Sequence, residues 1–138
     1  MLALIPARNE EATVRDVIRN LLAQNIGWVR VVDNGSVDDT PQEARRAGAE
    51  VLNEPKRGYG RACWHGLQAL PADCEWLLFC DADGSDDLGE LPHFFKAALE
   101  SDFVLGNRRC RSRRDANLGR LQHFGNGLAT GLIRWVWG

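Results

Sequence analysis

LALIPARNEEATVRDVIRNLLAQN, residues 2–25, places a short apolar run, a polar loop and a helical pattern in direct succession. The opening run at 2–5 has no polar alternation and predicts a strand buried on both faces. In the second half, the apolar residues recur with the spacing of one helix face, at Val14, Val17, Ile18, Leu21 and Leu22. Asn9 is the expected cap of this helix, with acids in its first turn. A buried strand that leads into an amphipathic helix is the repeating unit of α/β proteins.

The same alternation continues along the chain. Further strands are expected at 29–32, 49–52, 76–79 and 102–106, and helices over 10–25, 40–47, 60–70 and 88–100 and from residue 118. Asp38 or Asp39 is expected to cap the second helix, and Gly48 to end it. This order predicts an α/β fold with a mainly parallel sheet and helices on both faces. With 138 residues and no linker, residues 1–138 are expected to form a single domain.

Composition sets the broad class. The chain is 44% hydrophobic and 26% charged with a net charge of −2, which indicates a globular protein and excludes general binding to nucleic acid. The cysteines have no metal-ligand spacing and are expected to be reduced thiols: Cys63, Cys74, Cys80 and Cys110. No signal peptide or membrane span is recognisable, so a cytoplasmic location is expected. The last residues, LATGLIRWVWG, have no polar tail, and we expect the chain to be truncated on this side.

The polar segments that follow the predicted strands indicate where a ligand binds. In open α/β sheets, ligands bind beyond the carboxyl ends of the strands. The five strand exits are PARNEE at 6–11, DNGSVDDT at 33–40, NEPKRGYG at 53–60, DADGSDD at 81–87 and GNRRCRSRR at 106–114. All five are rich in Gly, Asp, Asn or Arg, so the site is expected at this edge of the sheet.

Four acids crowd the exit of the fourth strand: Asp81, Asp83, Asp86 and Asp87. Like charges at this density repel one another, which favours a bound cation. In an extended segment, Asp81 and Asp83 project to the same side and can face one Mg²⁺ or Mn²⁺, whose remaining ligands would be water and phosphate. The alternative is that these acids cap the following helix and lie in solvent.

The other exits could bind the rest of a nucleotide. Asp33 could accept from a base N–H or a ribose hydroxyl, or instead from its own turn. Lys56, Arg57 and Arg61 surround two glycines and could hold an anion, or form only a flexible turn. The arginines at 108–114 could neutralise a diphosphate or a phosphorylated acceptor. A solvated basic loop is the alternative there, and a nucleic-acid patch is less favoured because no aromatic residue is interleaved.

In this order, IPARNEE, VVDNGSVDDT, RGYGRACWHGL, DADGSDDLGELPHF and VLGNR resemble family 2 glycosyltransferases of the GT-A fold. The resemblance runs from residue 2 to about residue 130 and is closest to the branch of dolichyl-phosphate mannosyltransferases and polyprenyl-phosphate sugar transferases. It implies a Rossmann-like, three-layer GT-A fold. It also implies metal-dependent transfer of a sugar from a UDP- or GDP-linked donor, with a polyprenyl (dolichyl-like) phosphate as the expected acceptor.

The resemblance implies roles for individual residues. The donor nucleotide would contact Pro6, Ala7, Arg8, Glu10, Asp33, Gly35, Ser36, Lys56, Gly58, Arg61, Asp81 and Ala82. Asp83 would be the direct metal ligand and Asp81 would lie nearer the sugar or ribose. Ser85 stands where relatives often carry Gln and would be a weaker ligand, so Asp86 or water could complete the shell. Arg108 would face the diphosphate and would join Asp81 and Asp83 as a catalytic residue.

The acceptor side leaves alternatives open. After Asp115 the sequence contains no acid, and a phosphate acceptor, unlike an alcohol, needs no general base, although truncation explains the absence equally well. The apolar helix expected from residue 118 could pack on the parent domain or on a second copy, or lie at the inner face of a membrane. Two rival functions are a sugar-phosphate nucleotidyltransferase, disfavoured because RNEEAT at 8–13 lacks glycine, and a non-catalytic nucleotide-binding scaffold.

Overall fold

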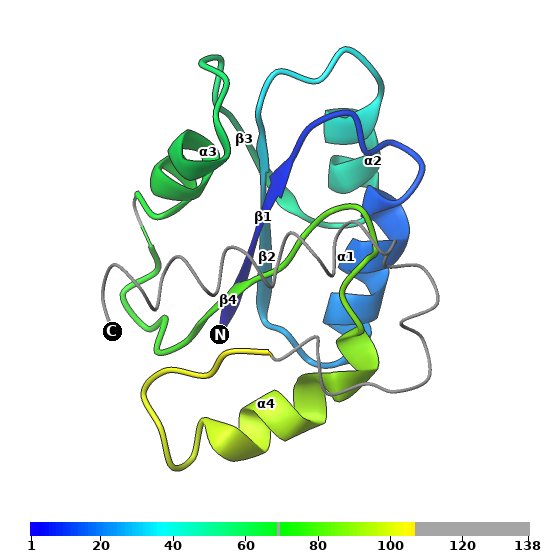
Figure 1. The fold of residues 1–138 in the computed structure, drawn as a ribbon. Helices are drawn as coiled ribbons and strands as arrows, with labels where there is room; N and C mark the ends of the chain where they lie inside the picture. The colour runs from blue at the N-terminus through cyan, green and yellow to red at the C-terminus, as the bar shows by residue number, and fades with distance from the viewer. Residues whose placement is uncertain (69, 107–138) are drawn as a thin grey trace, which may run out of the picture. The chain divides into compact units, whose positions relative to one another are not determined.

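The computed structural model describes residues 1–68 and 70–106 of the chain. Residues Met1–Lys96 form one compact unit, and a second unit begins at Ala97. The elements in chain order are β1 (Leu2–Ala7), α1 (Val14–Ala23), β2 (Trp28–Asp33), α2 (Thr40–Arg46), β3 (Glu50–Asn53), α3 (Tyr59–Gly66), β4 (Leu77–Phe79), a 3₁₀ turn (Leu88–Glu90) and α4 (Leu91–Ala97) (Figure 1).

Four parallel strands form the sheet, in the order β3-β2-β1-β4. Helices α1 and α2 lie on one face of the sheet and α3 lies on the other (Figure 1). The register pairs Ala7 with Asp33 and Asp33 with Asn53, so these three strands end side by side. The predicted α/β fold with a parallel sheet between two helical layers is therefore confirmed.

The core forms around β1, whose six residues are all buried. Alternate side chains of a strand point to opposite faces, and each set joins a different apolar cluster. Ile5 packs in the cluster that contains Ile18 and Leu21 of α1, whereas Leu4 packs in the cluster that contains Ala62 of α3. Burial of a side chain of this size contributes about 1.5–3 kcal/mol, so a two-sided central strand holds both helical layers against the sheet.

Helix α3 approaches the sheet closely at its carboxyl end. A Cβ atom on Gly66 would lie 2.2 Å from Leu4 Cδ1 and 2.9 Å from Val32 Cγ2, so a side chain does not fit there. Arg30 of β2 is buried and donates to the Gly66 carbonyl at 2.9 Å. An arginine cation at the last carbonyls of a helix satisfies groups that the helix leaves unpaired. This end of α3 is thereby fixed, which also positions its first residue.

The first helix begins later than the sequence predicts. It starts at Val14, and Asn9 is not its cap. Asn9 has a φ of 57° in the left-handed region, and its side-chain Oδ1 accepts a hydrogen bond from the Val37 N–H at 2.9 Å. The amide that was expected to cap a helix instead connects two loops.

Two other predicted elements differ from the structure. The apolar run at 102–106 is not a strand, because a strand needs a hydrogen-bonded neighbour and the described sheet does not include this run. The third helix ends at Gly66 rather than near residue 70, with the carbonyls of Gly66 and Gln68 bonded to Arg30. The helix expected from residue 118, and with it the predicted membrane or dimer contact, lies outside the described residues.

Two smaller predictions can also be compared with the structure. Cys63, Cys74 and Cys80 are free thiols as expected, and Cys110 lies outside the described residues. In the described part of the chain, none of the helices has both the length and the hydropathy of a membrane span.

Candidate functional site

A cavity of about 460 Å³ lies at the carboxyl ends of β1 and β4, beside the start of α3. Its walls are Pro6, Ala7, Arg8, Glu10, Asn34, Arg57, Gly58, Tyr59, Ala62, Asp81, Ala82 and Asp83. Because β1 has β2 on one side and β4 on the other, the order of the strands reverses at this point. Open α/β sheets bind their ligands at such a switch point.

The loops after β1 and β2 are bonded to each other and form one wall of the cavity. The Asn9 N–H donates to Ser36 Oγ at 3.0 Å, and the Glu10 N–H donates to Thr40 Oγ1 at 2.7 Å. Desolvation would raise the pKa of Asp38, but hydrogen bonds from Thr40 and from the Glu11 N–H outweigh it and hold that pKa below its usual value. These contacts fix the backbone that carries Arg8 and Glu10 before any ligand binds.

Asn34 fixes the loop that leads into α3. This buried side chain accepts from the Gly58 N–H at 2.7 Å and donates to the carbonyls of Glu54 and Lys56 at 2.9 and 2.8 Å. Three hydrogen bonds from one amide hold the whole turn against the end of β2. Arg57 lies inside that turn and faces the cavity.

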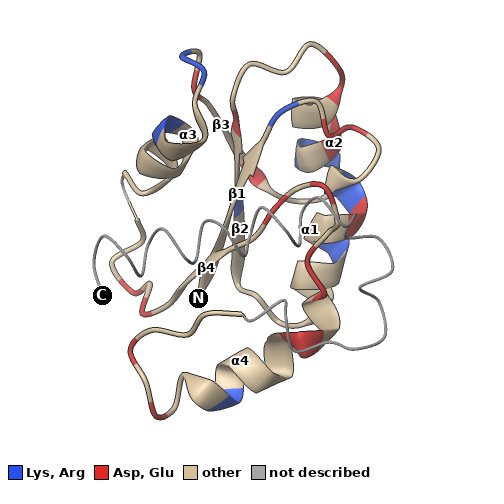
Figure 2. Ribbon diagram, in the orientation of Figure 1, with Lys and Arg blue, Asp and Glu red and all other residues tan. Residues whose placement is uncertain are grey.

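The four acids after β4 have different roles. Asp81 and Asp83 line the cavity, whereas Asp86 Oδ2 accepts from the Asp81 N–H at 2.9 Å and Asp87 accepts from the Gly89 N–H at 3.0 Å. Figure 2 shows acidic residues along this loop, with basic residues in the loop before α3 and on α3. Two of the acids therefore stabilise the loop, as the capping alternative anticipated, and two face the space where a ligand would lie.

The carboxylates of Asp81 and Asp83 suit a divalent cation. Their carboxylate oxygens are the hard donors that Mg²⁺ and Mn²⁺ prefer. No preformed group of three or more ligating side chains exists among the described residues. Mg²⁺ commonly takes only one or two carboxylates from a protein and the rest of its shell from water and phosphates, so this pair fits an ion that arrives with a diphosphate.

Tyr59, the first residue of α3, lies next to the acid pair. Its hydroxyl is 3.4 Å from Asp81 Oδ1. Desolvation, followed by the negative charge of Asp81, raises the pKa of Tyr59 to about 12. The phenol therefore keeps its proton at neutral pH and can act as a donor to the carboxylate.

Most of the site residues inferred from the sequence meet in this cavity. Its lining includes Pro6, Ala7, Arg8, Glu10, Gly58, Asp81, Ala82 and Asp83. Asp33, Gly35 and Ser36 instead line a neighbouring cavity of about 610 Å³ against α2 and β3. Asp33 accepts from the Ser36 N–H at 3.3 Å, which is the contact of a turn acid with its own backbone. Arg108 lies outside the described residues.

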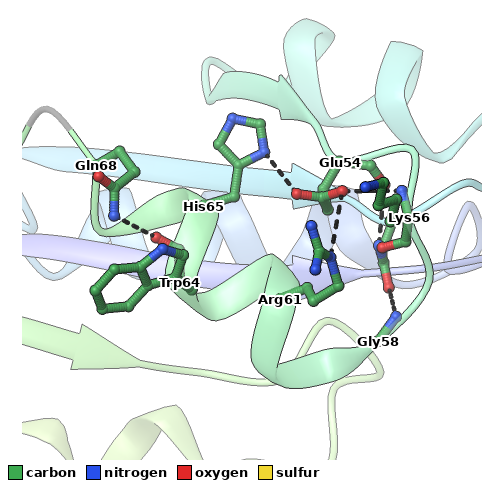
Figure 3. Close-up of polar contacts among 8 residues, drawn as sticks. Glu54, Lys56, Gly58, Arg61, Trp64, His65 and Gln68 are labelled. Atoms are coloured by element: carbon green, nitrogen blue, oxygen red, sulfur yellow. Dashed lines mark hydrogen bonds and ion pairs between the residues drawn. The ribbon is translucent and has the colours of Figure 1, made fainter.

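Three predicted residues line neither cavity: Lys56, Arg61 and Ser85. Arg61 Nε lies 3.8 Å from Glu54 Oε1, and the same carboxylate has His65 Nδ1 at 3.3 Å from its Oε2 (Figure 3). The Lys56 N–H also donates to Glu54 at 2.8 Å. The mostly buried Glu54 thus directs Arg61 away from the cavity, and Arg57 is the basic residue of this loop that faces it.

Sequence reasoning assigned no role to Asn34 or Tyr59. Asn34 follows directly after the last residue of β2, and its N–H donates to the Ala7 carbonyl at 2.9 Å, so it lies at the junction of two strand exits. Tyr59 stands between two glycines at the start of a helix. A polar residue directly after a buried strand, and a large side chain within a glycine turn, are the signals that could have indicated both.

Comparisons with known proteins indicate the family of this chain. The model for "Glycosyl transferase family 2" matches residues 3–136. An uncharacterized glycosyltransferase of Mycobacterium tuberculosis is 41% identical over 109 residues, covering 77% of this chain and 47% of that protein.

Two solved structures are similar in fold and sequence. Glucosyl-3-phosphoglycerate synthase from Mycobacterium tuberculosis, in complex with Mn²⁺, uridine-diphosphate and glucosyl-3-phosphoglycerate, has a TM-score of 0.61 and 28% identity, covering 71% of this chain and 39% of that one. Mannosyl-3-phosphoglycerate synthase from Rubrobacter xylanophilus has a TM-score of 0.58 and 31% identity, and the match covers 65% of this chain and 32% of that one. The GT-A fold expected from the sequence is thereby confirmed, whereas the polyprenyl-phosphate branch stays a prediction.

The chain spans about half the length of the curated relatives it matches. Because the family model matches nearly all of its residues, the chain belongs to glycosyl transferase family 2.

Proposed function

We propose that this chain provides the donor site of a metal-dependent glycosyltransferase, which moves a sugar from a nucleoside diphosphate to a phosphate-bearing acceptor. The observation that carries the proposal is the composition of the switch-point cavity. It combines three acids, Glu10, Asp81 and Asp83, with two arginines, Arg8 and Arg57. A diphosphate with a divalent cation carries both signs of charge, so the cation would complement the acids and the phosphates would complement the arginines.

The donor residues divide by the chemistry they can offer. Pro6 and Ala7 bring backbone close to the cavity and would contact the nucleoside, while Arg8 and Arg57 would pair with phosphate oxygens. Asp33 lies at the neighbouring strand end and is proposed to reach the base or ribose with the part of its carboxylate that does not hold the turn. Arg108 is proposed to face the diphosphate from the segment after residue 106.

Asp83 is proposed as the direct ligand of the cation, and Asp81 as the acid nearer the sugar or ribose. When bound, the cation would stabilise the negative charge that develops on the leaving diphosphate. Arg8 and Arg57, which line the same cavity, would add to this stabilisation. Support comes from the solved relative that was crystallised with Mn²⁺, uridine-diphosphate and glucosyl-3-phosphoglycerate.

The acceptor is proposed to carry a phosphate group. The resemblance to the polyprenyl-phosphate branch implies a polyprenyl phosphate, an acceptor that is already an anion and needs no general base. The two solved relatives described above are named for phosphoglycerate products, which also bear a phosphate. A phosphorylated acceptor is therefore the class that both lines of reasoning share.

A donor-turnover assay tests the proposal. The chain is incubated with UDP-glucose or GDP-mannose and Mn²⁺, with 3-phosphoglycerate in one series and a short polyprenyl phosphate in another. Release of the nucleoside diphosphate that depends on one acceptor supports the proposal and identifies the acceptor. Tight binding of the nucleotide without acceptor-dependent turnover would instead support the scaffold function. Consumption of a nucleoside triphosphate with a sugar phosphate would support the nucleotidyltransferase, which family membership disfavours.

A further inference from the structure

We infer that Tyr59 is a positioning residue for Asp81, whose carboxylate it orients toward the cation and diphosphate of the donor. The inference rests on the proposed function and assigns to it a residue that has no place in the predicted site. Tyr59 and Asp81 come from different elements, line the same cavity and approach each other to 3.4 Å between Oη and Oδ1.

The fold fixes both ends of this contact. On one side, Tyr59 follows Gly58, which has a φ of 143° and donates its N–H to the buried Asn34. The other end of α3 is held where Gly66 packs against β1, so the helix cannot slide along the sheet without losing one of these contacts. The Asp81 backbone is in turn held by the hydrogen bond from its N–H to Asp86.

The chemistry of a phenol suits this task. A lysine or arginine beside Asp81 would cancel its charge and compete with the cation, whereas a neutral hydroxyl orients the carboxylate and leaves its charge unchanged. Carboxylates that bind metals commonly accept such a hydrogen bond from a neighbouring group, which selects one orientation.

The ring of Tyr59 could have a second effect that must be separated from the first. The residue is 62% exposed and forms part of the cavity wall, so the ring could contact a nucleotide directly. Tyr59→Phe removes only the hydroxyl and keeps that ring. Trp64 lies on the same helix, is 69% exposed and does not line the cavity, so Trp64→Ala controls for the effect of changing an exposed aromatic residue of α3 outside the cavity.

The test measures the Kd of UDP and of GDP by calorimetry, in Mn²⁺ and in EDTA, for the wild type, Tyr59→Phe and Trp64→Ala. The Kd in EDTA divided by the Kd in Mn²⁺ reports the metal-dependent part of binding. Tyr59→Phe should lower this ratio about tenfold, by raising the Kd in Mn²⁺ while the Kd in EDTA stays unchanged. About tenfold is the lower end of the effect of removing a partner of a metal ligand. Trp64→Ala should change neither value, and melting temperatures should confirm that all three proteins are folded.

Each contrary result has a distinct meaning. If Tyr59→Phe has the same ratio of Kd in EDTA to Kd in Mn²⁺ as the wild type, the inference is overturned and the proposed function is unaffected. Equal losses in Mn²⁺ and in EDTA would also overturn it, because they would assign the hydroxyl to the nucleotide or to the local fold. If Mn²⁺ changes the wild-type Kd of neither UDP nor GDP, the proposed function fails and the inference fails with it.

Discussion

The side-chain oxygen of Asn34 accepts a 2.7 Å hydrogen bond from the backbone N–H of Gly58, which joins the end of β2 to the residue before α3. The same amide donates to two carbonyls in the intervening turn. One side chain therefore determines where the basic loop lies relative to the strand exits. Because Arg57 reaches the cavity from this loop, the contact connects the fold directly to the candidate donor site.

Asn34→Ala should lower both stability and nucleotide binding. The substitution leaves three backbone groups without their partner, and since the loop is accessible to water, we expect the lower part of the usual range, about 1 kcal/mol. Asn53, at the end of the adjacent strand, is exposed and provides the matched control in Asn53→Ala. Urea unfolding and calorimetry with UDP measure the two effects. Identical behaviour of both variants would contradict the role of Asn34.

Gly66→Ala should destabilise the protein by about 1–3 kcal/mol, the usual cost of forcing extra volume into a packed interface. The added methyl would collide with Leu4 and Val32, on which α3 rests. Gly60→Ala, in the same helix, meets no atom within 4 Å and should be neutral or stabilising by up to about 1 kcal/mol. Urea unfolding of both variants measures the difference. Equal effects would contradict the close packing of α3 on the sheet.

Stability should fall at acidic pH partly through Asp38. Hydrogen bonds from Thr40 and Glu11, acting against desolvation, hold the folded-state pKa of Asp38 below its ordinary value of 3.8. A depressed pKa contributes stability that is complete above the unfolded value and is lost as pH falls through the folded value. Below pH 3.8, the wild type should therefore lose more stability than Asp38→Asn, as measured by urea unfolding across pH. Parallel pH curves for the two proteins would contradict this account.

The two arginines of the basic loop should differ in effect. Arg57→Ala should weaken UDP about tenfold and uridine hardly at all, because a charge-assisted hydrogen bond to phosphate is removed. Arg61→Ala should leave both affinities nearly unchanged, since Arg61 contacts Glu54 instead of the cavity. Calorimetry with UDP and uridine distinguishes the two outcomes. A larger loss of UDP affinity in Arg61→Ala would show that the arginine turns toward the ligand on binding.

The strands around β1 could be predicted from the sequence because burial on both faces leaves an uninterrupted apolar run, as in LALI at 2–5. Loop contacts could not be predicted in the same way, since they depend on residues that are distant in sequence. Asn9 was expected to cap a helix, but its side-chain oxygen accepts a hydrogen bond from the Val37 N–H, 28 residues away. Likewise, nothing local indicates that Glu54 attracts Arg61 while Arg57 remains at the cavity.

At the acid-rich exit of β4, the position of two acids could be predicted from residues that are adjacent in sequence, while their metal-binding role stays a prediction. Asp81 and Asp83 do line one cavity, and their neighbour Asp86 holds the loop. Ser85, predicted as a weak metal ligand, is exposed and bonds Asp83 only through its backbone N–H, at 2.8 Å. The role of its side chain stays a prediction. Comparing the Kd of UDP in Mn²⁺ between Ser85→Ala and wild type can test it.

The most direct test of the donor site is the melting temperature of the wild type and of Asp83→Ala with UDP and with GDP, each in Mn²⁺ and in EDTA. A ligand that binds only the native state raises the melting temperature by mass action. We predict a rise for one nucleoside diphosphate that requires Mn²⁺ and that disappears in Asp83→Ala, whose melting temperature without ligand stays close to wild type because Asp83 is exposed. A rise of the same size in Asp83→Ala, or in EDTA, would contradict a metal-dependent donor site at the end of β4.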